Sequence, residues 1–255
     1  MRDLLAAVNA EFTKLRSLRS TLVALSLFFP ISLGIGILEG WSTSGAIARH
    51  SPMLRPDFSS AQAGFDGVLY GQLALIVFSV LLVTNEYGSR MIGLSLLAVP
   101  RRGVFYAAKM IVTGLAAAVA SVPAVILAYL ATQLALGPYG ASLSASGVQR
   151  AMLGAVGYLT MMSIFAAGIA VMARNPIVPL ATLLPLVLAG SQILSVIGAT
   201  ASMSRFLPDQ AGMRMLAVSV GGGDKLSPVA GLAVLLGWTA GAVIAGYVLL
   251  HRRDA

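Results

Sequence analysis

Cysteine is absent from the 255 residues, which excludes disulfides, thiolate metal sites and cysteine nucleophiles. Charged residues are also scarce: they make up 10% of the chain, whereas ordinary globular proteins carry about 25%. Hydrophobic residues account for 58%. So little charge cannot cover a surface that faces water. The composition therefore excludes a soluble globular protein and indicates an apolar surrounding.

Catalytic signatures are missing as well. The two histidines, His50 and His251, are far apart and form no H-E-x-x-H zinc helix. Neither a phosphate loop nor a dinucleotide fingerprint is present, and GGGDKLS at 221–227 lacks the glycine that must precede the lysine. The 17 Lys and Arg residues lie between apolar runs rather than in a basic stripe, which argues against nucleic acid. We expect a non-catalytic chain without its own cofactor, metal or nucleic-acid partner.

Six stretches are long and apolar enough to cross a bilayer, whose core of about 30 Å needs roughly 20 helical residues. Their lengths favour helices over barrel strands. The sequence thus predicts an all-α integral membrane protein with one transmembrane domain. Pro30, Pro123 and Pro185 lie inside spans and predict bends. The predicted spans are residues 21–38, 68–84, 110–136, 151–173, 177–197 and 229–250.

The distribution of basic residues predicts the orientation. With six spans both termini share one side, and that side carries 11 Lys and Arg residues against 6 on the other. The positive-inside rule therefore predicts that both termini are cytoplasmic.

Residues 3–18 form an amphipathic pattern before the first span. Leu4, Val8, Phe12 and Leu15 fall on one stripe, while we place Glu11 and the other charged residues elsewhere. The pattern predicts a helix in the membrane interface. Such a helix either only anchors the first span or also docks a cytoplasmic partner, and the sequence leaves both open.

Two segments between spans carry further signals. Residues 85–109 combine a polar start, a short apolar stretch and Pro100, which together predict a short projecting helix. Residues 198–228 carry turn and breaker signals around apolar pieces that are too short to cross, and they predict helix pieces that dip back into the outer leaflet.

The predicted span interiors hold no Asp, Glu, Lys, Arg or His, which argues against ion-coupled transport. Their neutral polar groups either line a substrate pathway or bond to neighbouring helices. The pairs Gly67 with Gly71 and Gly237 with Gly241 have a spacing that permits close helix approach. The candidates for the pathway are Tyr70, Gln72, Gln133 and Gln192, with Ser79, Thr160, Ser163 and Ser191 as further polar groups.

Four segments in order carry a resemblance: AEFTKLRSLRST at 10–21, NEYGSRMIGLSLLAVPRRGVFYAAK at 85–109, LPDQAG at 207–212, and GGGDKLSPVAGLAVLLGWTAG at 221–241 before a terminal RRDA. Together with six spans they resemble a type-two ABC transporter permease of the actinobacterial kind, over essentially the whole chain. Family members usually have threonine where this chain has Arg90. The residues that match within 85–109 are Glu86, Gly88, Leu97, Pro100, Arg102 and Lys109.

The resemblance implies a permease subunit of an ATP-driven exporter in a bacterial cell membrane. It implies two separate cytoplasmic ATPase subunits that bind ATP and Mg²⁺, and a second permease copy or homologue. The family's coupling helix would lie within residues 86–102, and its outer re-entrant element would be residues 203–220. Residues expected to couple to the ATPase are Glu86, Tyr87, Arg90, Pro100, Arg101 and Arg102, and Glu86 has the alternative of a carboxylate held at the membrane interface.

The expected substrate is hydrophobic or amphipathic, such as a drug, antibiotic, peptide or lipid. Two other functions stay open: an autonomous carrier or channel, and a scaffold subunit that transports nothing. The first predicts activity without nucleotide, and the second predicts a complex without substrate-dependent ATP turnover.

Overall fold

The computed structural model describes residues 2–51, 58–88, 101–197, 200–219 and 226–252. Within these ranges the chain is helical and contains no strand. Six helical stretches are long and apolar enough to cross a membrane, which confirms the predicted all-α class with six spans. That the whole chain forms one transmembrane domain stays a prediction. The six stretches are Arg19–Ala48, Ser60–Tyr87, Arg102–Tyr139, Val148–Ala173, Ile177–Val196 and Pro228–Arg252.

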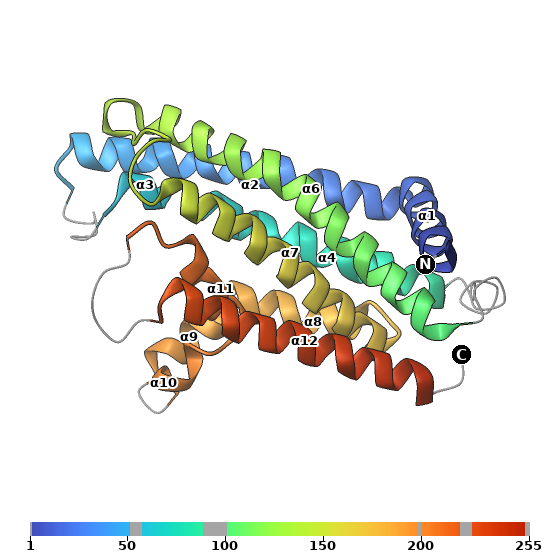
Figure 1. The fold of residues 1–255 in the computed structure, drawn as a ribbon. Coiled ribbons are helices and arrows are strands. Elements are labelled where there is room, and N and C mark those ends of the chain that lie inside the picture. The colour runs from blue at the N-terminus through green and yellow to red at the C-terminus, as the bar shows by residue number, and fades with distance from the viewer. Residues whose placement is uncertain (1, 52–57, 89–100, 198–199, 220–225, 253–255) are drawn as a thin grey trace.

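The long helices run side by side along one axis, joined by short elements at the two ends (Figure 1). In chain order the elements are α1 (Arg2–Ser17), α2 (Arg19–Ala48), α3 (Ser60–Ala63), α4 (Asp66–Gly88), α6 (Arg102–Leu136), η1 (Gly137–Tyr139), α7 (Val148–Ala173), α8 (Ile177–Pro185), η2 (Leu186–Gly190), α9 (Ser191–Val196), α10 (Ala201–Ser204), α11 (Pro208–Met213), η3 (Arg214–Leu216) and α12 (Pro228–Arg252).

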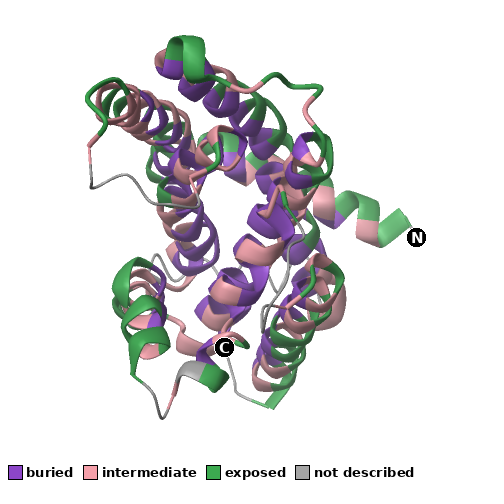
Figure 2. Cartoon of the chain, turned by 90° about the vertical axis from the view of Figure 1, so that its left-hand side faces the viewer, coloured by how far each residue is buried: buried purple, intermediate pink, exposed green. Residues whose placement is uncertain are grey.

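The helices α4, α6 and α7 form the centre of the bundle, where Phe78, Tyr129 and Tyr158 are fully buried. The span windows of α2, of the fifth span and of α12 are much less buried within the chain. Figure 2 shows buried residues on the inward helix faces and exposed residues on the outward faces. Exposed outward residues such as Val119, Leu153 and Ile244 are apolar, so this surface fits lipid rather than water.

Glycines let α2 and α4 approach closely. A Cβ atom at Gly67 would lie 2.4 Å from the Ser32 carbonyl oxygen, and one at Gly71 would lie 1.9 Å from Ser32 Oγ. The first predicted glycine pair therefore does permit close packing. The second pair does not act within the described chain, since nothing lies within 4 Å of a Cβ built at Gly237 or Gly241.

The fifth span is irregular at its proline. It runs through α8, the π-helical turn η2 and α9, and Pro185 stands directly before η2. Proline lacks the N–H that would continue the α-helical ladder, so the backbone shifts register there. The Ser191 hydroxyl donates a hydrogen bond to the carbonyl oxygen of Leu186 at 2.8 Å.

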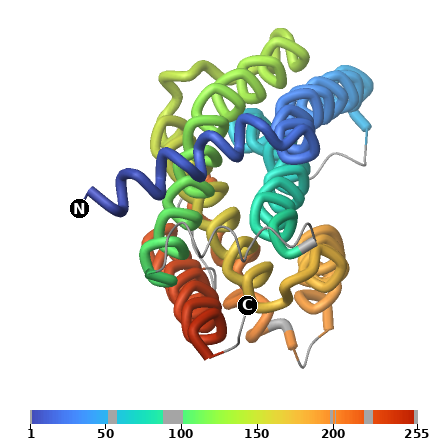
Figure 3. Tube along the Cα trace, turned by 90° about the vertical axis from the view of Figure 1, so that its right-hand side faces the viewer, coloured from blue at the N-terminus to red at the C-terminus, as the bar shows by residue number. Residues whose placement is uncertain are grey.

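Helix α1 lies across the end of the bundle instead of along it (Figure 3). It packs mainly on α6, and the last turn of α4, the first turn of α6 and the last turn of α12 lie at the same end (Figure 1). We call this the terminal end. The end that carries α3, η1 and α11 is called the opposite end.

At the opposite end, residues 200–219 form the short helices α10, α11 and η3, as expected for helix pieces between breakers. Arg150 of α7 donates to the carbonyl oxygens of Ala217 at 2.7 Å and Val218 at 3.0 Å. The side chain of Gln62 accepts from the Val218 amide at 2.9 Å. This segment is therefore tied to α3 and α7, while its re-entry into a membrane stays a prediction.

Candidate functional site

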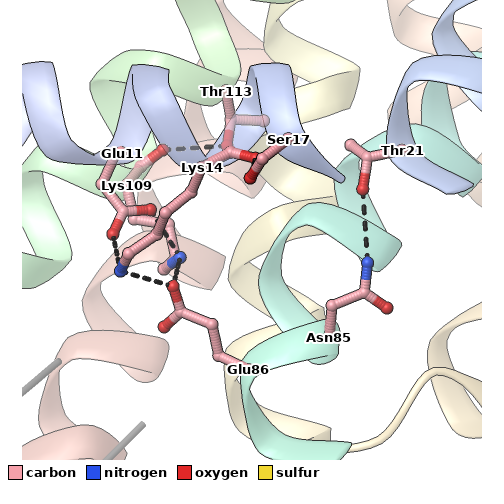
Figure 4. Close-up of polar contacts among 8 residues, drawn as sticks. All are labelled: Glu11, Lys14, Ser17, Thr21, Asn85, Glu86, Lys109 and Thr113. Carbon is pink, nitrogen blue, oxygen red and sulfur yellow. Dashed lines mark hydrogen bonds and ion pairs between the residues drawn. The ribbon is translucent and has the colours of Figure 1, made fainter. Parts of the chain in front are cut away.

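Two glutamates and two lysines meet at the terminal end. Glu11 and Lys14 come from α1, Glu86 from the last turns of α4, and Lys109 from the start of α6 (Figure 4). We call these four residues the charge cluster. Glu11 accepts from Lys14 and from Lys109, each at 2.7 Å, through its two separate oxygens. Glu86 Oε1 accepts from Lys14 at 2.8 Å and from Lys109 at 3.1 Å.

The four side chains form a closed and neutral ring, because each carboxylate is shared by both ammonium groups. Glu11 and Lys109 are 3% exposed and Glu86 is 6% exposed. The ring of Phe105 covers the lysines, with its centroid 5.2 Å from Lys109 Nζ and 5.6 Å from Lys14 Nζ. Buried charges are stable only when they are paired and hydrogen-bonded in this way.

The position of Glu11 differs from the prediction for the amphipathic helix. We placed Glu11 away from the apolar stripe, but it lies on the buried face together with Ala7 and Leu15. Residues four apart lie on the same face of a helix, and Glu11 is four residues from both. The carboxylate tolerates this position because Lys109 lies directly opposite on α6.

The pKa values of the two α1 residues in the cluster are shifted by their partners. Burial by itself would raise the pKa of Glu11, but the charges and hydrogen bonds of Lys109 and Lys14 outweigh burial and hold this pKa below its ordinary value. Burial would lower the pKa of Lys14, but hydrogen bonds to Glu11 and Glu86 raise it above its ordinary value. Both groups therefore stay charged across the neutral range.

Further contacts tie both flanks of residues 89–100 to the rest of the terminal end. On the α4 side, the Asn85 amide donates to Ser20 and Thr21 of α2, each at 3.3 Å. On the α6 side, Arg102 donates to the carbonyl oxygens of Leu250 at 3.1 Å and His251 at 3.5 Å, at the end of α12. These contacts join the α4 flank to α2 and the α6 flank to α12.

The expected coupling residues fall into three groups. Three of them bond to other helices at the terminal end: Glu86 in the charge cluster, Arg102 to the end of α12, and Arg101 through an exposed ion pair with Asp3 at 2.9 Å. Tyr87 packs beneath Arg174, whose guanidinium carbon lies 5.8 Å from the ring centroid, at the turn between α7 and α8. Arg90 and Pro100, and most of the predicted coupling helix, lie outside the described residues.

The predicted stripe of α1 faces the bundle in part. Leu15 is buried, and Leu4, Val8 and Phe12 are half-buried. Val8 and Phe12 pack against the core of the bundle. The contact with α6 shows that α1 is fixed to the bundle, while its place in a membrane interface stays a prediction.

The structure does not bring the predicted pathway residues together. Gln72 is buried on α4 and accepts from the Tyr158 hydroxyl, while Gln133 on α6 bonds to the Ser60 carbonyl oxygen and the Ala141 amide, each at 2.8 Å. Tyr70 and Gln192 are exposed. Gln72 and Gln133 therefore serve contacts between elements, and a pathway role for the four stays a prediction.

Sequence reasoning missed three residues that the structure brings into prominence. Glu11 and Lys14 stand at i and i+3, a spacing that favours an ion pair, and this signal was available. No local signal marks Asp209, which is fully buried in α11 at the opposite end. Among the described residues, no cluster of three or more histidine or carboxylate side chains has a geometry that could hold a metal ion.

Comparison with known proteins identifies a family of membrane transporters. No curated protein matches the chain. The family described as ABC-2 family transporter protein matches residues 7–190, which extends from α1 through the charge cluster to the end of η2. Because this match spans well over half of the sequence, the chain belongs to the ABC-2 family of membrane transporter proteins.

Proposed function

We propose that the chain is the membrane permease of an ATP-driven exporter, working with two cytoplasmic ATPase subunits and a second permease copy or homologue. Membership of the ABC-2 family supports a permease that associates with ABC ATPases. ATP and Mg²⁺ would bind to those subunits. The proposal includes the bacterial cell membrane as location and cytoplasmic termini, on the strength of the 11 to 6 distribution of basic residues.

The charge cluster is the observation that carries the proposal. In the sequence, residues 89–100 lie between Glu86 and Lys109. Glu86 and Lys109 each form an ion pair with helix α1. A force applied by an ATPase to this segment would therefore move α1, α4 and α6 as one unit. Arg102 would pass the same force to α12.

The proposed mechanism follows from this mechanical link. Closure of the paired ATPases would push on residues 86–102, and the ion pairs would carry the push into the bundle. The spans would then reorient and release substrate on the far side. Buried ion pairs suit this role, since a buried charge resists separation from its partner.

A hydrophobic or amphipathic substrate fits the walls of the bundle. Some described polar groups inside the spans, such as Ser79 and Thr160, bond to the carbonyl oxygen one turn earlier and leave apolar surfaces for contact. Neutral walls select no single ligand, so we expect recognition of a class of compounds.

The first experiment is to purify the tagged chain in mild detergent and identify soluble proteins that co-purify in stoichiometric amounts. We expect an ATPase with a phosphate loop and vanadate-sensitive turnover. An intact oligomer with no ATPase would contradict the proposal and favour an autonomous carrier or a scaffold.

The second experiment tests coupling in the reconstituted complex. Glu86→Gln should leave basal ATP hydrolysis present but abolish transport, because the α4 flank loses its hold on α1. Asp3→Asn is the matched control, since it removes a carboxylate of α1 that is exposed and lies outside the cluster. Unchanged transport in folded Glu86→Gln would overturn the coupling role.

A further inference from the structure

Among the described residues, one carboxyl group is fully buried at the opposite end of the molecule. Asp209 lies in α11 with none of its surface exposed. Its Oδ2 atom contacts the hydroxyl of Ser191 and, at 3.3 Å, the side-chain amide of Gln210. Its Oδ1 atom is buried and has no hydrogen-bond partner among the described residues.

No positive charge compensates this carboxyl group within the described residues. Arg205 and Arg214 flank α11, and none of the ion pairs among the described residues includes Asp209. The titratable group that faces it from α7 is Tyr158, whose ring packs against Gly212 and whose hydroxyl donates to Gln72. The facing part of α12, around Gly231 and Leu235, is apolar.

The number of protons available for hydrogen bonds at Ser191 indicates the protonation state of Asp209. Ser191 Oγ lies within hydrogen-bond distance of both the Leu186 carbonyl oxygen and Asp209 Oδ2. A serine hydroxyl has one proton and can donate to only one of these two acceptors. Both contacts are hydrogen bonds only if Asp209 carries a proton, so that Oδ2–H donates to Ser191 and Ser191 donates to Leu186.

We propose that Asp209 is a proton-binding site whose bound proton fastens α11 to the fifth span through Ser191. One proton passes from water to the carboxylate, and no other group changes its charge. Loss of this proton leaves a buried anion whose partners, the Gln210 side-chain amide and a Ser191 hydroxyl that must release Leu186, carry no charge. A buried anion without a positive partner is costly, and this cost favours opening of α11 toward water. Burial, which outweighs the hydrogen bonds from Ser191 and Gln210, raises the pKa of Asp209 above its ordinary value, and this agrees with the geometry.

The site joins two elements that can move apart. Ser191 is the first residue of α9, directly after the π-helical turn, where the fifth span is already irregular. The other end of the segment is held by Arg150 and Gln62. Because the uncompensated anion at this junction is drawn toward water, deprotonation of Asp209 would loosen α11 on the side of the fifth span while the second attachment stays in place.

The experiment uses the absence of native cysteine. A single reporter cysteine is introduced as Ala211→Cys, at a fully buried position of α11, and the protein is placed in lipid nanodiscs, where a maleimide reaches both faces. Labelling is measured from mildly acidic to mildly alkaline pH with Asp209 and with Asp209→Asn. The ratio of the two rates at each pH cancels the intrinsic reactivity of the thiol.

We expect the labelling rate with Asp209, divided by the rate with Asp209→Asn, to rise with pH, because only the chain with Asp209 loosens. Ser191→Ala should label fast at every pH, and Glu39→Gln, which removes a carboxylate from α2, should preserve the pH dependence. A ratio that stays constant with pH would overturn the proposal. If Ala211→Cys does not fold, Ser204→Cys in α10, a nearly isosteric change, serves as the reporter.

Infrared difference spectroscopy provides a second readout that needs no reporter. A protonated carboxyl group has its own C=O band, and the chain has only 9 Asp and Glu residues. We expect a band that titrates with pH and is lost in Asp209→Asn. Absence of such a band would overturn the proposal even if labelling changed. Neither readout requires ATP, substrate or a partner, so the result is independent of the proposed exporter function.

Discussion

The two ends of the molecule bury carboxyl groups by different means. At the terminal end, Glu11 and Glu86 are each held by two lysines, so their charge is compensated. At the opposite end, Asp209 is held by a hydroxyl and an amide, neither of which carries charge. Moving a carboxylate out of water is costly unless an opposite charge or a proton neutralises it. The first end uses ion pairs, and we infer that the second uses a proton.

This difference predicts opposite sensitivities. The cluster depends on having all its partners, because removal of one leaves a buried charge. The Asp209 site depends on pH, because it has no charged partner to lose. The variants that follow separate the two, from the largest expected effect to the smallest.

Lys109→Met should be the most damaging single change. It leaves Glu11 and Glu86 with Lys14 alone, and breaking a buried ion pair costs about 3–5 kcal/mol. Asp209→Asn keeps the uncharged state and should cost much less. Thermal unfolding of both variants in detergent measures the difference. A larger loss in Asp209→Asn would contradict the contrast between the two ends.

The double variant Glu86→Gln with Lys109→Met should be more stable than the sum of its single variants. It removes one charge of each sign and leaves Glu11 paired with Lys14 at 2.7 Å. Residues in one ion-pair network show interaction energies of about 0.5–3 kcal/mol. Additive losses in the four-member cycle would show that the cluster does not act as a unit.

The pH dependence of unfolding should differ between the ends in sign. The pKa of Asp209 is raised on folding, so its contribution is present below the unfolded pKa of about 3.9 and is lost as pH rises through the folded pKa. The pKa of Glu11 is lowered, so its contribution is present above about 4.3 and is lost as pH falls through the folded pKa.

Melting temperatures across this range test both signs. Asp209→Asn should remove the loss of stability at higher pH, and Glu11→Gln should remove part of the loss at acidic pH. The raised pKa of Lys14 keeps this lysine charged at mildly alkaline pH, so its pairing with Glu11 persists where the Asp209 effect is expected. Loss of both effects in one variant would show that the two ends are not independent.

Asp3→Asn should have the smallest effect. Its ion pair with Arg101 joins α1 to α6 like the cluster, but both side chains are mostly exposed, at 66% and 76%. Exposed ion pairs contribute about 0–1 kcal/mol and are screened by salt. A shift in unfolding as large as that of Lys109→Met would mean that exposure does not decide the strength of pairs at this end.

Local patterns predicted much of the architecture. Hydropathy predicted all six spans, because a helix that faces lipid needs a continuous apolar run. Pro185 predicted the irregular fifth span, and Gly67 with Gly71 predicted close helix packing. The resemblance to type-two ABC permeases predicted the family that the match at residues 7–190 confirms.

The sites depended on contacts that no local pattern contains. Lys109 meets Glu11 across 98 positions of sequence, and Tyr158 meets Gln72 across 86. Placing Glu11 off the stripe was wrong, because Glu11 lies four residues before Leu15 and therefore on the same face of the helix. Gln72 and Gln133 were identified as polar groups within spans, but only the structure gave their partners.

The sequence by itself determined that this chain is a helical membrane protein with six spans, since the bilayer acts on each segment separately through its length and polarity. The tertiary structure alone decided which buried charges are paired and which carboxyl group is left with neutral partners. The physical reason is that burial of charge is settled by the groups on neighbouring helices, and folding brings those together from distant positions in the chain.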